Sequence, residues 1–220
     1  MQLPDKDAHY DARVGFGRYT ARRLRREGKT GLEADVIQVT EAVLVAGRAK
    51  EDVAALVQAA LADRDGADDD LDDIAKDARA NLAGRSAEAA RTAPYTQVFP
   101  AGIEYYTAAP LAEEVSRYEE LGKRIVENLG AQDPVRVGAV PAIQKGVTAF
   151  EVAAKAVDKA RTDVALADTR LVAAEEAWDR QMEKTYGALV AELGRAKADR
   201  FFPKSRKAGK RAGEETSKAK

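Results

Sequence analysis

The clearest pattern in this sequence is a periodic apolar stripe in its C-terminal third. From position 150 to position 178, apolar residues recur at alternating steps of three and four: Phe150, Ala153, Val157, Ala160, Val164, Ala167, Leu171, Ala174 and Trp178. This spacing places them on one face of a helix and is typical of a coiled-coil seam. Beyond Trp178 an extra step of four, up to Met182, indicates a stutter that locally unwinds a supercoil. We therefore predict one helix from Gly146 to Phe202, roughly 80 Å long at 1.5 Å per residue.

Two more helices are predicted upstream. A stripe of similar length predicts a helix over about 32–63, the expected antiparallel partner of the long helix: Leu32, Val36, Val39, Val43, Ala46, Val53, Val57 and Ala60. The acidic run Asp68, Asp69 and Asp70 predicts the start of a second helix, over about 69–91. Carboxylates favour that position because they cap free N–H groups and meet the positive end of the helix dipole.

The remaining helices are predicted from their start and stop signals. Pro110 fits the first turn of a helix that ends near Leu129, and the inward positions are Leu111, Val115, Tyr118 (or Leu121), Ile125 and Leu129. Asp133 and Pro134 form an N-cap and first-turn pair. The residues after them predict a kinked lead-in to the long helix because they include Gly138, Pro141 and Gly146. A short helix is also predicted over residues 5–28, and two glycines within it are expected to weaken it.

The segment 92–110 differs from the rest because it holds three of the seven prolines and four of the thirteen aromatic residues. We predict an extended strap across the bundle, pinned by Tyr95, Phe99, Tyr105 and Tyr106, since each aromatic ring buries about 150–250 Å². The alternative is that these four rings line a pocket for a partner or ligand. The two readings differ in whether loss of a ring affects stability or binding.

Composition supports a helical fold. Charged residues make up 33% of the chain and aromatics only 6%, and alanine is the commonest residue. Helices are favoured by this mix, because alanine loses no side-chain entropy in a helix, whereas sheets favour β-branched and aromatic residues. The predicted fold class is all-α, an elongated antiparallel four-helix bundle with a very long coiled-coil-like C-terminal helix. The expected divisions are a basic, partly ordered arm at 1–30, the bundle at 31–202 and a disordered basic tail at 203–220.

Candidate chemistry is sparse. The chain has no cysteine and a single histidine, His9, so Cys-based zinc sites, thiol catalysis and a di-iron site with Glu-x-x-His pairs are not supported. Residues 63–72 resemble an EF-hand loop only in part, since Leu61 would occupy the first ligand position and Asp72 the last. The acid pairs at 113–114, 119–120 and 175–176 are predicted to lie on exposed helix faces. We therefore expect no enzyme activity, no catalytic residues, no cofactor and no metal.

The net charge of −1 conceals an uneven distribution. Residues 1–30 carry +4 and residues 203–220 carry +5, which leaves −10 for the body between them. Basic ends can bind phosphates, and the phosphate-contact candidates are Arg18, Arg22, Arg23, Arg25, Arg26, Lys204, Arg206, Lys207, Lys210 and Arg211. The alternative is that these ends only keep the protein soluble.

The expected function follows from the helices. We expect a structural or interaction protein that self-associates, or docks a helical protein partner, along its long seam. The alternative is sequence-independent nucleic-acid binding by the basic ends. The chain has no apolar run long enough for a membrane span and no apolar leader, so the expected location is the cytoplasm.

Overall fold

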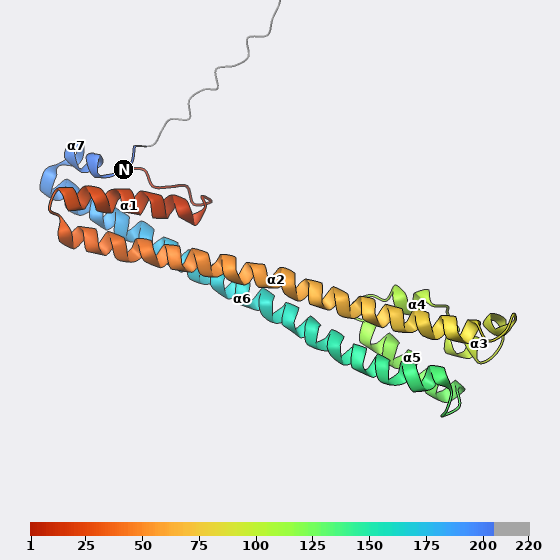
Figure 1. Cartoon of the computed structure of the whole chain (residues 1–220). Coiled ribbons are helices and arrows are strands. Elements are labelled where there is room, and N and C mark those ends of the chain that lie inside the picture. The colour runs from red at the N-terminus through yellow and green to blue at the C-terminus, as the bar shows by residue number, and fades with distance from the viewer. Residues whose placement is uncertain (205–220) are drawn as a thin grey trace, which may run out of the picture. The chain divides into compact units, whose positions relative to one another are not determined.

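The computed structural model describes residues 1–204, and it is all-α with 80% helix (Figure 1). Its elements in chain order are α1 (Tyr10–Arg26), α2 (Thr30–Ala83), η1 (Ala89–Arg91), α3 (Tyr95–Val98), α4 (Glu104–Thr107), α5 (Glu114–Asn128), α6 (Pro134–Leu193), α7 (Arg195–Ala198) and η2 (Asp199–Phe201). The long helices α2 and α6 pack antiparallel. The predicted fold class and the pairing of two long helices are confirmed, whereas a four-helix bundle is not clearly formed.

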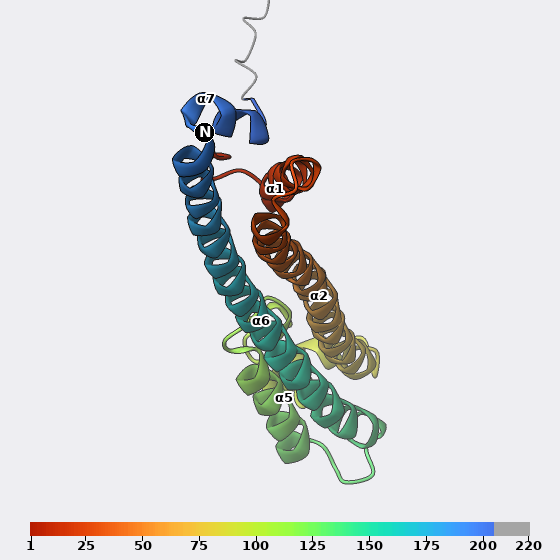
Figure 2. The same ribbon diagram turned by 90° about the vertical axis from the view of Figure 1, so that its left-hand side faces the viewer.

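The chain forms two compact units. The terminal unit comprises Met1–Glu51 together with the chain from Leu166 onward, and the central unit comprises Asp52–Ala165. Each unit contains a part of α2 and a part of α6. The third long element of the terminal unit is α1, and that of the central unit is α5, which runs alongside α6 (Figure 2).

The seam predicted on α6 is confirmed by its burial. Every seam position from Phe150 to Trp178 is buried or half-buried. In the terminal unit, Trp178 is fully buried, and its indole N–H donates to the hydroxyl of Thr40 on α2 at 3.1 Å. In the central unit, an ideal Cβ on Gly146 would lie only 2.7 Å from the Leu71 side chain, so this glycine lets α6 approach α2 closely. Gly146 was expected to contribute to a kink, but it instead leaves space for the Leu71 side chain.

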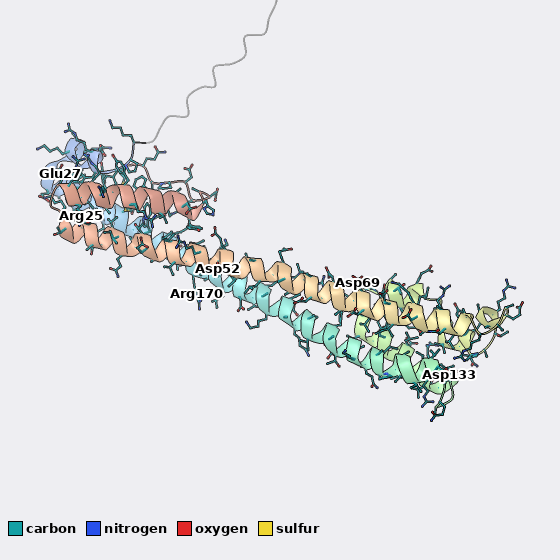
Figure 3. The ribbon with its side chains drawn as sticks, in the orientation of Figure 1. Arg25, Glu27, Asp52, Asp69, Asp133 and Arg170 are labelled. Carbon is teal, nitrogen blue, oxygen red and sulfur yellow. The ribbon has the colours of Figure 1, made fainter. Side chains whose placement is uncertain are left out.

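The predicted break in α2 is wrong. The helix continues from Thr30 to Ala83, through the acidic run that was expected to start a new helix. Its buried stripe continues across the run at Ala67, Leu71, Ala75, Ala78 and Leu82, and Asp69 lies on the exposed side (Figure 3). Because the apolar face is never interrupted, the carboxylates do not need to cap anything. With 54 residues, α2 is also long enough to pair with α6 over most of its length.

The bounds of the last helix also differ from the prediction. It begins at Pro134, where the Asp133 carboxylate accepts from the Val135 backbone N–H at 3.0 Å, so the predicted N-cap is confirmed. The predicted kinked lead-in is wrong, because Pro141 lies inside the continuous helix with its ring exposed. The helix ends at Leu193 rather than near residue 202, since Gly194 has a φ of 75°, outside the helical region.

The segment 92–110 is not extended. It contains the two short helices α3 and α4, and the Tyr106 hydroxyl in α4 donates to the Val98 carbonyl in α3 at 3.3 Å. The ring of Phe99 meets that of Tyr106 edge-on, with centroids 5.8 Å apart, and both residues belong to the core of the central unit. Leu111, predicted to face inward, is exposed because α5 begins only at Glu114.

Candidate functional site

An apolar groove lies between α5 and α6 in the central unit. It encloses about 620 Å³ and its floor consists of Gly122 and Val126 from α5 with Val140, Ile143 and Val147 from α6. At Gly122 an ideal Cβ would lie 3.9 Å from Ile143, in ordinary van der Waals contact, so a larger side chain there would extend into the groove. Val126 is 39% exposed, so part of the apolar floor faces solvent.

The rim of this groove is acidic. Its polar residues are Glu119, Lys123, Glu127, Gln144, Thr148 and Glu151, which together carry a charge of −2. Within residues 1–204, none of the three rim glutamates forms an ion pair, whereas the neighbouring Glu120 is held by Arg124 at 2.6 Å. Unpaired carboxylates around an apolar floor are suited to a cationic, amphipathic occupant.

The basic residues of α1 form a second candidate surface. Arg22 and Arg26 are exposed and, in the part of the chain that the structure describes, have no ion pair. Arg25, near the end of the helix (Figure 3), lies 3.8 Å from Glu33, and Arg18 is paired with an acidic residue of α2 in the same way. Exposed Tyr19 lines a surface pocket together with Arg22, Arg23, Arg25 and Arg26.

The other phosphate-contact candidates are placed as follows. The Nε of Arg23 is buried and has no hydrogen-bond partner. Lys204 is exposed at the end of the described chain. Arg206, Lys207, Lys210 and Arg211 lie outside the described residues, so the basic tail as a phosphate-binding segment stays a prediction.

The four aromatic candidates of segment 92–110 divide into two kinds. Phe99 and Tyr106 are buried, and burial raises the pKa of the Tyr106 hydroxyl to about 12. Tyr95 and Tyr105 are half-buried, and their hydroxyls bond Arg79 and Glu120 at 3.1 and 2.9 Å. The rings thus pack against their own unit, and their role in binding a partner stays a prediction.

The structure contains a buried carboxyl group that was not predicted from the sequence. Glu114, the first residue of α5, is only 2% exposed, although it was predicted to lie on an exposed face. From α2, it faces the acidic side chain of Asp68. Close by, the Tyr118 hydroxyl donates to Asp72 at 2.8 Å. Burial and the Asp68 charge raise the pKa of Glu114 to about 8. The helical spacing of Glu114 to Tyr118, Leu121 and Ile125 was the one feature of the sequence that indicated an inward position.

No protein family, curated protein or solved structure matches this chain. Within residues 1–204, no helix is both long and apolar enough to cross a membrane. Over the same residues, no three acidic, His or Cys side chains are grouped so as to hold a metal ion. The candidate functional features are therefore the groove, the basic face of α1 and the buried carboxyl group of Glu114.

Proposed function

We propose that this chain is a non-enzymatic interaction protein that docks a basic amphipathic helix in the groove between α5 and α6. The observation that carries the proposal is an apolar floor surrounded by three glutamates that have no ion partner among residues 1–204. An apolar stripe on the docked helix would cover the floor, and its flanking Lys or Arg side chains would meet the rim.

The dimensions of the groove suit a helix. Its lining residues on α6 extend from Val140 to Glu151, which at 1.5 Å per residue corresponds to roughly 16 Å, or three turns. A helix of that length presents anchors at positions i, i+4, i+7 and i+11, enough to contact the floor residues on both α5 and α6.

A second copy of this chain is a poorer occupant of the groove. The central unit carries 20 acidic and 13 basic residues, a net charge of −7, so two such units repel each other. The seam of α6, the expected docking surface, is buried or half-buried within the chain itself. The proposed partner is therefore a different, basic protein, and the groove replaces the seam as the docking surface.

The test is a binding titration with a designed peptide. The probe is a fluorescein-labelled, alanine-based helix of about 16 residues with Leu at i, i+4, i+7 and i+11 and Lys at the flanking positions. We expect saturable binding to the full chain by fluorescence anisotropy. Replacing Lys by Glu in the peptide should weaken binding by about tenfold at low salt, because the rim then repels the flanks.

Two glycine variants provide the matched comparison. Gly122→Leu fills the groove floor and should raise the Kd by about tenfold or more, the effect expected at the centre of an interface. Gly66→Leu places the same side chain on α2, where an ideal Cβ meets nothing within 4 Å, and should leave the Kd unchanged. Equal affinity of both variants, or no binding by the wild type, would refute the proposal.

The second candidate function is binding of nucleic acid by the outer face of α1. It is favoured by Arg22 and Arg26, which have no ion pair among residues 1–204, beside the exposed ring of Tyr19. Arginines of this kind contact phosphates, and an exposed ring can stack on an unpaired base. This activity would be independent of sequence.

Its test is the salt dependence of binding to single-stranded DNA. Arg22→Gln with Arg26→Gln should lower the slope of log K against log salt by about 0.7 per lost phosphate contact. Arg170→Gln removes an exposed positive charge from α6 (Figure 3) and should have no effect. No binding at low salt, or the same slope in all variants, would exclude this candidate.

A further inference from the structure

The start of α5 is joined to α2 by acidic side chains. Glu114 is the first residue of α5 and is 2% exposed, and no donor reaches its buried Oε1 atom. The same carboxyl faces the acidic side chain of Asp68 on α2. A buried carboxyl group that no donor reaches is strongly disfavoured in its ionised form, so this position favours a protonated Glu114.

The surroundings give Glu114 little positive charge. From α2 it faces Asp68 and Asp72, and Asp68 is also next to Asp65 and Asp69. From α5, Arg117 is the cation that acts on it, but Arg117 is already bound to the Glu113 carboxylate at 2.6 Å. Lys76 pairs with Asp72 at 3.2 Å, and Tyr118 donates to the same carboxylate.

We infer that the buried Glu114 keeps a proton where it faces Asp68, and that this proton fixes the start of α5 on α2, so that its loss as the pH rises loosens this end of the helix. The contact would act as a pH-dependent latch within the central unit. It is independent of the groove, because none of the groove residues takes part in it.

The direction of the effect follows from the two states of the latch. Burial and the facing Asp68 raise the pKa of Glu114 to about 8 in the closed state, and burial also raises the pKa of Asp68. In an opened state, Glu114 would titrate near 4.3, like a free carboxyl group. The closed state therefore binds the extra proton, and opening increases from about pH 4.5 to pH 8 and then levels off.

The test combines a carboxyl titration and hydrogen exchange on the full chain. The side-chain carboxyl carbon of Glu114, assigned by its absence in Glu114→Gln, should titrate by NMR with a midpoint near pH 8. Exchange of the first α5 amides, corrected for intrinsic rates, should rise by up to about tenfold per pH unit between pH 5.5 and 7.5. In Glu114→Gln, which carries no titrating group there, this pH dependence should be lost.

Two further variants keep the test decisive. Asp70→Asn removes one exposed charge from the same acidic run and should retain the wild-type pH dependence. Asp68→Asn removes the facing carboxylate, so the midpoint of Glu114 should fall by about one pH unit or more. A wild-type midpoint between pH 4 and 5, or α5 exchange with the same pH dependence in Glu114→Gln, would overturn the inference.

Discussion

The substitution Phe99→Ala tests the role of the aromatic segment. Phe99 is 3% exposed and packs against two tyrosine rings, those of Tyr95 and Tyr106, at centroid distances of 5.7 and 5.8 Å. Deleting a buried phenylalanine ring costs about 3–5 kcal/mol, because the cavity that remains cannot be filled by the surrounding chain. For an m-value of about 2 kcal/mol/M, the midpoint of urea unfolding should fall by about 2 M.

The assay must report on the central unit alone. The NMR amide signals of residues 52–165, followed through the urea titration, report on this unit, whereas the fluorescence of Trp178, the single tryptophan, follows the terminal unit. The control is Leu111→Ala in the same connection, where the side chain is 52% exposed and the cost should stay within about 0.5 kcal/mol. A midpoint for Phe99→Ala equal to that of this control would show that the ring is not a structural anchor.

Two further pairs of substitutions test the packing of α2. An ideal Cβ on Gly47 would lie 2.5 Å from the Tyr10 ring, so Gly47→Ala should cost about 1–3 kcal/mol of unfolding free energy. Gly66→Ala, where a Cβ has open space, should stabilise the helix by up to about 1 kcal/mol. Changes of the same sign for both variants in urea unfolding would contradict this packing. Thr40→Val removes the hydroxyl that accepts from the Trp178 indole and should lower the free energy of unfolding by about 1–3 kcal/mol. Thr40→Ser keeps a hydroxyl and should cost less. Equal midpoints of urea unfolding for the two variants would refute the role of this hydrogen bond.

The long helices could be predicted because their signal is repetitive. From Phe150 to Trp178 the apolar spacing fits one helical face, and the structure buries or half-buries each of those positions. The acidic run around Asp69 was misjudged because capping carboxylates and solvated mid-helix carboxylates have the same sequence pattern. Only the apolar positions on the opposite face distinguish them, and these continue without interruption.

The candidate sites were harder to predict because they depend on contacts between distant segments. The groove floor depends on Gly122 facing Ile143 on another helix, and nothing local to either residue indicates this contact. Glu114 was assigned to solvent because acidic residues are almost never fully buried, and its partner Asp68 lies 46 positions earlier. The arginines of α1 were found from sequence because a charge cluster is visible without knowledge of the fold.

The most direct test of the proposed function is an NMR titration of the methyl-labelled full chain with the Lys-flanked helical peptide. The account predicts that chemical-shift changes concentrate on the methyl groups of Val126, Val140, Ile143 and Val147, and that Gly122→Leu abolishes them. Saturating shift changes elsewhere in the chain, or none at all at millimolar peptide, would contradict the assignment of the groove as the docking surface.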